Sequence, residues 1–231
     1  MNSSRYTTEN YISQNPDYHQ DDSPWKVKYI AKMMSAHNLK PKSIAEIGCG
    51  AGEILNLLHQ QKNEEIDFHG FDISQSAIDL CNKKTQKNLK YHCADLTLED
   101  RYYDLLLCID VFEHVEDYFG FLKSVKTKAE YKIFHIPLDL SVLSIVMQDA
   151  TLLEWRSRIG HIHYFTRELA IETLNECGYE IVDSFLTPAG IERAKKMSAK
   201  CLKYPRLFLS MFSKDFANRI LGGYSLLVLA K

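Results

Sequence analysis

Short apolar runs alternate with amphipathic segments along most of this 231-residue chain. In the first amphipathic segment, 25–38, Val27, Ile30 and Met34 recur at helical spacing, and Pro41 closes it. Such alternation predicts an α/β fold in which helices cover a parallel sheet. Strands are expected at 43–47, 66–73, 90–93, 103–109, 131–136, 179–185 and 224–230, and further helices at 53–61, 74–84, 118–127, 138–158 and 167–177.

Composition and charge narrow the class of protein. With 45% hydrophobic and 25% charged residues the chain is typical of an ordinary globular domain. The net charge of −2 creates no field that attracts nucleic acid, so a nucleic-acid partner is not expected. No signal peptide and no run of 18 apolar residues occurs, which predicts a cytoplasmic protein. The six cysteines have no zinc-site spacing and are expected to be reduced.

A glycine-rich stretch, Glu46-Ile-Gly-Cys-Gly-Ala-Gly52, stands where the first strand passes into a helix. In a doubly wound sheet this position binds nucleotide-like ligands, because glycines let the backbone turn tightly and approach a ligand closely. The dinucleotide fingerprint needs a third glycine at position 53, which is Glu53 here. The spacing therefore argues against a nicotinamide-dependent oxidoreductase.

This stretch resembles the first motif of the class I S-adenosylmethionine-dependent methyltransferases, E/D-x-G-x-G-x-G. Glu46, Gly48, Gly50 and Gly52 match it in full, and Cys49 lies between two of the glycines. The resemblance implies that these five residues contact S-adenosyl-L-methionine as cofactor. It also implies a doubly wound, Rossmann-like fold, with a mainly parallel seven-stranded sheet, an antiparallel last strand and helices on both faces.

Two acids match later motifs of the same family. Asp72, followed by Ile73, stands where family members hold the ribose hydroxyls, which a carboxylate does with charge-assisted hydrogen bonds. Asp95 resembles the family acid that accepts from the adenine amino group, while the next backbone N–H, that of Leu96, donates to the ring. The resemblance covers about residues 43–137.

The segment after the fourth strand matches the family as well. Ile109, Asp110 and His114 stand where family members line the methionine half of the cofactor. Taken singly, each matching position has an ordinary alternative: a helix N-terminal acid, a turn acid, or, for Glu113 and His114, a solvated helix start. The order and spacing of the four motifs favour cofactor binding.

A second resemblance concerns the substrate. The segment Gly160-His-Ile-His-Tyr-Phe-Thr-Arg-Glu-Leu169 is similar to a pattern of small-molecule methyltransferases, in the branch that includes ubiquinone-type O-methyltransferases and sugar-modifying enzymes. It implies a small-molecule methyl acceptor, with O-methylation of a sugar or secondary metabolite as the leading reaction. The segment 187–221 departs from the short connection that this branch has before its last strand.

Methyl transfer from a sulfonium needs mainly in-line positioning, and a hydroxyl acceptor also gains from a general base. Histidines suit a base at neutral pH. His161, His114 and His163 are the catalytic candidates, with His135 also near the predicted cleft, and His161 is favoured; ordering of its own loop is the alternative role. No third ligand accompanies His161 and His163 in the sequence, so no metal site is expected.

The resemblance divides the chain into a lid and first helix at 1–40, the cofactor-binding core at 41–186, a helical cap insertion at 187–221 and the last strand at 222–231. In the lid we expect aromatic rings, or Lys26 or Lys28, to contact the cofactor or the substrate; alternatively, Trp25 anchors the first helix. The aromatic residues of the proposed lid are Tyr11, Tyr18, His19 and Trp25.

The basic and aromatic insertion 187–221 leaves three interpretations open. It suits a cap over the substrate, or a solvated basic face with an ordinary buried apolar stripe. It also suits an interfacial helix attracted to anionic lipid, which would imply a lipid-linked substrate. A binding module that keeps the cofactor pocket without catalysis is a further alternative for the whole chain. The sequence does not determine the oligomeric state.

Overall fold

The computed structural model describes residues 20–61, 65–194 and 197–231. Its centre is one seven-stranded sheet in the order β3-β2-β1-β4-β5-β7-β6. Neighbouring strands from β3 to β5 pair in parallel, and β7 runs antiparallel to both of its neighbours. The predicted mainly parallel sheet with an antiparallel last strand is confirmed. The strands are β1 Ser43–Ile47, β2 Asp67–Asp72, β3 Leu89–Cys93, β4 Tyr103–Ile109, β5 Ala129–Pro137, β6 Ile181–Thr187 and β7 Ser225–Ala230.

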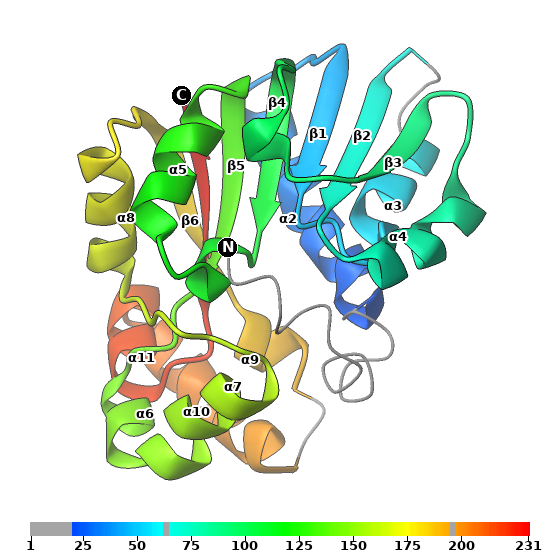
Figure 1. Cartoon of the computed structure of the whole chain (residues 1–231). Helices are drawn as coiled ribbons and strands as arrows, with labels where there is room; N and C mark the ends of the chain where they lie inside the picture. The colour runs from blue at the N-terminus through cyan, green and yellow to red at the C-terminus, as the bar shows by residue number, and fades with distance from the viewer. Residues whose placement is uncertain (1–19, 62–64, 195–196) are drawn as a thin grey trace.

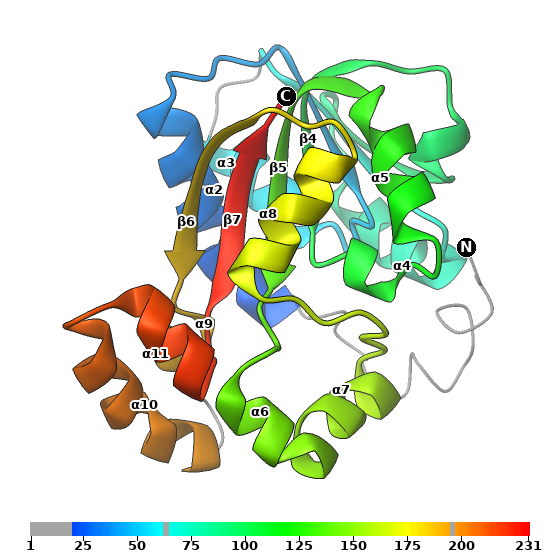
Figure 2. The same cartoon turned by 90° about the vertical axis from the view of Figure 1, so that its left-hand side faces the viewer.

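Helices cover both faces of this sheet, as Figures 1 and 2 show. Helices α2 (Ser23–Ala36) and α3 (Glu53–Gln61) bury leucine, isoleucine and methionine side chains against one face. Helices α5 (Tyr118–Lys126) and α8 (Arg167–Glu176) pack on the other face around aromatic residues of the core. The short α4 (Gln75–Cys81) packs beside the glycine loop through Ile78 and Cys81.

The apolar run of the last strand matches its place inside the sheet. All six residues of β7 are buried. Leu227 and Leu229 belong to the core under α2 and α3, while Leu226 and Val228 belong to the core under α5 and α8. Strands buried on both faces read as continuous apolar runs, and β7 lies between β5 and β6.

The α-helices of segments 142–158 and 189–221 gather beyond the C-terminal ends of the parallel strands, the edge at which α/β folds bind ligands (Figure 1). Two of them, α6 (Val142–Val146) and α7 (Leu152–Arg158), occupy the stretch predicted as one mostly helical segment. A capping box of Ser141 and Ser144 begins α6. Thr151, with φ −130° and ψ −83°, leaves helical geometry and separates the two helices.

The other three helices make up segment 187–221: α9 (Ala189–Glu192), α10 (Met197–Ser210) and α11 (Lys214–Leu221). The buried guanidinium of Arg206 in α10 ties them together. It donates to the backbone oxygen of Leu221 at 2.9 and 3.3 Å, and to that of Gly190 at 3.2 Å. These oxygens lie in α9 and at the last residue of α11, so one cation joins all three helices. No described helix is long and apolar enough to cross a membrane.

Some boundaries differ from the prediction. The segment 74–84 is helical only to Cys81 and continues as a 3₁₀ turn. The strand expected at 179–185 begins at Ile181 and ends at Thr187. Tyr179 instead belongs to the turn after α8, where its buried hydroxyl donates to the backbone oxygen of Leu122 at 2.7 Å. A local apolar pattern does not reveal such a contact, because its partner is 57 residues away.

Candidate functional site

The glycine loop after β1 has the conformation that its sequence requires. Gly48, Gly50 and Gly52 have φ values of 67°, 51° and 75°, in the left-handed region that side chains rarely adopt. Space is also restricted, because a Cβ on Gly48 would lie 2.8 Å from a methyl of Val111, and one on Gly52 would lie 2.4 Å from the ring of Tyr91. The loop therefore presents bare backbone at the C-terminal edge of the sheet.

Asp72 ends β2 directly beside this loop. One carboxylate oxygen accepts from the backbone N–H of Gly50 at 2.9 Å, and the other from that of Ser74 at 2.8 Å. Burial raises the pKa of Asp72, and these backbone donors oppose the rise. The carboxylate is thus fixed in orientation while each oxygen keeps acceptor capacity. Ile73 follows it, half-buried.

Asp95 occupies the equivalent place after β3. Its Oδ1 accepts from the backbone N–H of Thr97 at 2.9 Å and from the Thr97 hydroxyl at 2.6 Å. It therefore begins the 3₁₀ turn Leu96–Leu98, so the interpretation of Asp95 as a turn acid describes part of its role. Leu96 is fully buried below this turn and fixes its position.

Glu46 lies in β1 just before the glycine loop and is 2% exposed. Its Oε2 has no hydrogen-bond partner among the described residues. Burial raises the pKa of Glu46 well above its ordinary value, and the charge of Lys26 opposes this only in part. An orphaned carboxyl oxygen beside bare backbone fits a ligand that carries hydrogen-bond donors.

Asp110 follows β4 and connects three segments of the chain. Its φ of 55° is unusual for a residue with a side chain. One oxygen lies 2.8 Å from Lys26 Nζ in α2, and the other lies 2.5 Å from His135 Nδ1 in β5. Burial works against ionisation, but the charges of His135 and Lys26 outweigh it and lower the pKa of Asp110. His135 also contacts the Thr187 hydroxyl at 3.2 Å, so its ring is held on both sides.

Glu113, His114 and His161 form a compact group next to this network. Their potential ligand atoms all lie within 4.8 Å of one another. Burial and the charge of Asp110 raise the pKa of Glu113 to about 8. Burial lowers the pKa of His161, but its hydrogen bond to Asp139 and the neighbouring negative charges raise it on balance. We call these three residues the Glu113–His114–His161 cluster.

Backbone contacts bring the two halves of this cluster together. The backbone N–H groups of Ile162 and His163 donate to the backbone oxygen of Glu113 at 3.0 and 3.1 Å. His114 and His161 then meet edge to face, with ring centroids 4.9 Å apart. The segment that follows α7 is thereby fastened to the segment that follows β4.

Comparisons with known proteins identify the family to which this chain belongs. A family model described as a methyltransferase domain matches residues 22–184. The chain belongs to this family. The resemblance to the class I S-adenosylmethionine-dependent methyltransferases is thereby confirmed.

Two curated relatives of the methyltransferase are ubiquinone biosynthesis O-methyltransferases. That of Coxiella burnetii (strain Dugway 5J108-111) is 33% identical over 101 residues, which are 41% of each chain. That of Rickettsia bellii (strain OSU 85-389) is 28% identical over 117 residues, 48% of each chain. The methyltransferase thus matches these relatives over less than half of their length.

Solved structures share the fold at low sequence identity. Magnesium protoporphyrin IX methyltransferase from Synechocystis PCC 6803 with bound SAH aligns with a TM-score of 0.60 and 16% identity, over 94% of this chain and 85% of that one. The plantazolicin methyltransferase BpumL in complex with SAH aligns with a TM-score of 0.61 and 18% identity, over 100% and 90% of the two chains.

The structure separates the histidines that the sequence proposed together. His161 and His114 belong to the cluster, whereas the Nε2 of His163 contacts the backbone oxygen of Val115 at 2.9 Å and its ring packs on Tyr118. The segment 160–165 of the methyltransferase is not a strand, so two positions of spacing do not place both rings on one side. His135 is engaged by Asp110 and Thr187, as described above.

One acid of this site, Asp139, has no motif that singles it out in the sequence, and a second, Glu113, differs from its ordinary alternative. Asp139 follows β5 and lies 2.5 Å from His161 Nδ1. The ordinary alternative for Glu113, a solvated helix start, does not hold, because its side chain is fully buried. An acid just past the end of a parallel strand, as Asp139 is, was the available indication, since such ends meet at the ligand edge.

The N-terminal part of the proposed lid, with Tyr11, Tyr18 and His19, lies outside the described residues. Trp25 donates from Nε1 to Glu192 of α9 at 2.7 Å, and Lys28 Nζ lies 3.6 Å from the same carboxylate. Helix α2 is therefore joined to α9.

Proposed function

We propose that this methyltransferase transfers the methyl group of S-adenosylmethionine to a hydroxyl of a small molecule, with a sugar or secondary metabolite as the leading acceptor class. The observation that carries the proposal is the Glu113–His114–His161 cluster, in which Glu113 and His161 are buried and Glu113 follows Asp110 by three residues. Transfer to oxygen benefits from a group that activates a hydroxyl, and imidazoles next to a carboxyl are suited to this. The curated relatives named above, both O-methyltransferases, support oxygen as the acceptor atom.

The first part of the mechanism is the binding of the cofactor. The backbone of Gly48, Gly50 and Gly52 would approach it, Asp72 would accept from the ribose hydroxyls, and Asp95 with the backbone N–H of Leu96 would hold the adenine. Glu46, Cys49, Ile73, Ile109, Asp110 and His114 complete the contact set. The cofactor supplies a methyl group bound to a sulfonium. The sulfur leaves as a neutral thioether, so the leaving group needs no acid.

The second part is the positioning and activation of the acceptor. Alignment of the hydroxyl with the methyl carbon lowers the barrier by up to about 7–11 kcal/mol in favourable systems. The cluster offers two ways to activate the hydroxyl: its imidazoles can accept the proton, or together with Glu113 they can hold a cation that lowers the pKa of the hydroxyl. Asp139 orients His161 by holding Nδ1, so that Nε2 is the atom that acts.

Calorimetric titration with S-adenosylhomocysteine tests the cofactor half of the proposal. We expect saturable binding by the wild type, a loss of ten- to a hundredfold in Asp72→Ala, and no comparable binding of NADH, since a hydrogen bond to a charged group contributes about 1.5–3 kcal/mol. Asp79→Ala is the matched control, because Asp79 is an exposed acid of the neighbouring helix α4. Preference for NADH, or equal losses in both variants, would contradict the proposal.

An acceptor screen tests the reaction itself. Sugars, phenols and other small hydroxyl compounds are incubated with radiolabelled cofactor, and the methylated product is separated and counted. His161→Gln is expected to lower turnover while cofactor binding persists. A protein that binds the cofactor and methylates no acceptor would instead be a non-catalytic binding module.

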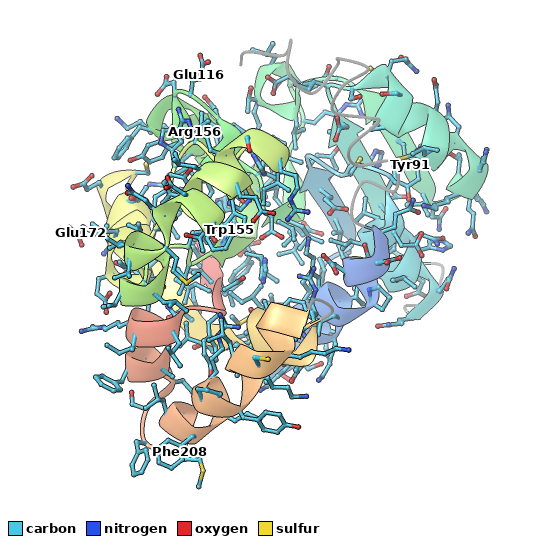
Figure 3. The ribbon with its side chains drawn as sticks, turned by 90° about the horizontal axis from the view of Figure 1, so that it is seen from below. Tyr91, Glu116, Trp155, Arg156, Glu172 and Phe208 are labelled. Atoms are coloured by element: carbon cyan, nitrogen blue, oxygen red, sulfur yellow. The ribbon has the colours of Figure 1, made fainter. Side chains whose placement is uncertain are left out.

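A second candidate function is methylation of a lipid-linked acceptor at a membrane surface. Tyr204, Phe208, Met211 and Phe212 recur at helical spacing along one side of α10 and the turn after it, and are 60–82% exposed. Phe208 lies at the outer edge of the molecule, away from the sheet (Figure 3). Basic Lys200, Lys203 and Lys214 accompany this apolar surface, a combination typical of helices that bind anionic lipid.

Vesicle sedimentation separates this candidate from the first. We expect the wild type to sediment with vesicles of anionic phosphatidylglycerol and less with neutral phosphatidylcholine. Phe208→Ser combined with Phe212→Ser should abolish sedimentation, whereas Leu98→Ser, which changes an apolar side chain 84% exposed on the opposite part of the fold, should not. Absence of wild-type binding to anionic vesicles removes the membrane candidate and leaves the first one unchanged.

A further inference from the structure

The carboxyl group of Glu113 is buried in a way that needs an explanation. Its side chain has 0% exposure, and neither Oε1 nor Oε2 has a hydrogen-bond partner among the described residues. Burying a carboxyl without partners costs several kcal/mol, and native proteins rarely leave such a group unsatisfied. The nearest nitrogen that could compensate it, Nε2 of His114, is 3.9 Å from Oε1, too far for a hydrogen bond.

The surrounding atoms are arranged as ligands of a cation would be. One atom each from Glu113, His114 and His161 lies within 4.8 Å of the other two. Asp139 Oδ2 lies 2.5 Å from Nδ1 of His161, which leaves Nε2 as the ligating atom. A carboxylate that holds the remote nitrogen of a ligating histidine is a recurring feature of protein metal sites, because it fixes the tautomer and orients the ring.

We propose that Glu113, His114 and His161 bind one divalent transition-metal ion of the zinc and cobalt type, with Asp139 as the positioning residue of His161. Two imidazoles and one carboxylate favour such ions over magnesium or calcium, which prefer oxygen ligands. Ligands at about 2.1 Å from a metal lie about 3.4 Å apart, so the three side chains close around the ion by about an ångström. Three protein ligands leave a coordination position for the substrate.

This site rests on the proposed function for its catalytic role, and it deepens that function by stating how the acceptor is activated. The hydroxyl oxygen of the acceptor binds at the open position, and its pKa falls because the cation stabilises the alkoxide or phenolate. The hydroxyl gives its proton to water. The oxygen then forms a bond to the methyl carbon while the carbon–sulfur bond breaks, and the bonding pair stays on sulfur, which becomes a neutral thioether.

Metal titration tests the site without any substrate. The purified protein, freed of metal with a chelator, is titrated with Co²⁺ while its visible absorption is recorded, and with Zn²⁺ in a calorimeter. We expect one ion per chain and a cobalt spectrum without thiolate bands, which the exposed Cys93 and Cys201 would produce. Glu113→Gln and His161→Gln should abolish binding, and Asp139→Asn should weaken it by about 10–100-fold.

His163→Gln is the matched control, because it makes the same change two residues from His161 at a ring that contacts Val115 instead of the cluster. It should bind Co²⁺ as the wild type does. Binding of S-adenosylhomocysteine by each variant checks that the variant is folded. If Glu113→Gln does not fold, the wild-type spectrum and His161→Gln still decide the result.

The possible results separate the metal site from the proposed function. A wild type that binds S-adenosylhomocysteine but no Co²⁺ or Zn²⁺ overturns the metal site and leaves the methyltransferase proposal standing, with the cluster as the base. Equal loss in His163→Gln and His161→Gln also overturns it. Metal binding with no cofactor binding would support the site and refute the proposed reaction.

Discussion

The proposed cofactor side of this molecule, at the glycine loop, and its proposed acceptor side, at the Glu113–His114–His161 cluster and segment 187–221, are built by different means. On the cofactor side, local backbone geometry shapes the site. The glycine loop has positive φ values. Asp72 and Asp95 each accept a hydrogen bond from a backbone N–H two residues further on, that of Ser74 and that of Thr97. On the acceptor side the contacts join distant parts of the chain. His161 meets Asp139, and Trp25 meets Glu192, which is 167 residues away.

A transferase must combine two properties: binding of a common cofactor and binding of its own acceptor. A cofactor that is the same for many enzymes can be held by loops whose geometry follows from a few residues at strand ends. An acceptor differs between enzymes, and in the proposed function its surroundings come from the segments between β5 and β6 and from segment 187–221. We therefore expect substitutions on the cofactor side to abolish binding of S-adenosylhomocysteine. Substitutions in segment 187–221 should change the free energy of unfolding and leave that binding unaffected.

The largest effect is expected from Gly52→Val. A valine there must adopt a φ of 75° and place its Cβ 2.4 Å from the Tyr91 ring, so the loop cannot keep its shape. Strain of about 1–2 kcal/mol for the left-handed conformation adds to the displacement of the ring. We expect calorimetry to show no binding of S-adenosylhomocysteine.

The control for this variant is Tyr91→Phe, which removes the hydroxyl that donates to the backbone oxygen of Gly52 at 2.7 Å but keeps the ring. It should weaken binding by less than about tenfold, the equivalent of one neutral hydrogen bond. Normal binding by Gly52→Val would show that the loop is not what holds the cofactor.

The fold and the cofactor side follow from local sequence to a large extent. The apolar run 224–230 predicts a strand buried on both faces because every one of its side chains has to be covered, and β7 lies inside the sheet between β5 and β6. The glycines of the loop are likewise predictable, since their spacing fixes which residues need positive φ. These features depend on residues within one turn or one strand.

The acceptor side was predicted less well because its partners are far apart in sequence. Nothing near Glu113 indicates that the segment 160–163 will cover it, and that segment donates to the Glu113 backbone oxygen from 49 and 50 positions away. The expectation that no further acid accompanies His161 rested on sequence neighbours, whereas Asp139 and Glu113 arrive from the ends of β5 and β4. Packing of non-local segments is what one sequence does not reveal.

A smaller effect, confined to the insertion, is expected from Arg206→Ala. Arg206 is 8% exposed, and its guanidinium donates three hydrogen bonds to two backbone oxygens, one in α9 and one at the end of α11. Its removal leaves buried carbonyl oxygens without donors, which costs about 2–4 kcal/mol of the free energy of unfolding. Hydrogen exchange should show faster exchange in 189–221, measured beside thermal unfolding.

Two results would sharpen the comparison between the sides. Binding of S-adenosylhomocysteine by Arg206→Ala should equal that of the wild type, because no described contact joins Arg206 to the glycine loop. Arg219→Ala is the matched control; this exposed side chain pairs with Glu168 at the surface and should change stability by less than about 1 kcal/mol. Loss of cofactor binding in Arg206→Ala would contradict the separation of the two sides.

The smallest effect concerns the contact between α2 and the insertion. Glu192 accepts from Trp25 Nε1 at 2.7 Å and from the Tyr29 hydroxyl at 3.0 Å. Glu192→Gln should cost about 1 kcal/mol or less, since the carboxylate is partly exposed and the amide oxygen still accepts. In a Trp155→Phe background Trp25 is the sole tryptophan, so its emission reports the change directly. Glu168→Gln, the same change in α8, should leave that emission unaltered.

The same single-tryptophan protein tests whether this contact belongs to the cofactor side. The Trp25 ring lies 5.8 Å from that of His135, which holds Asp110 at the end of β4. If α2 forms part of a lid, S-adenosylhomocysteine should shift the emission of Trp25, and Lys26→Ala, which frees Asp110 from its ion pair at 2.8 Å, should reduce that shift. If saturating cofactor leaves the emission unchanged, Trp25 only anchors α2 to the insertion, and the lid is refuted for this part of the chain.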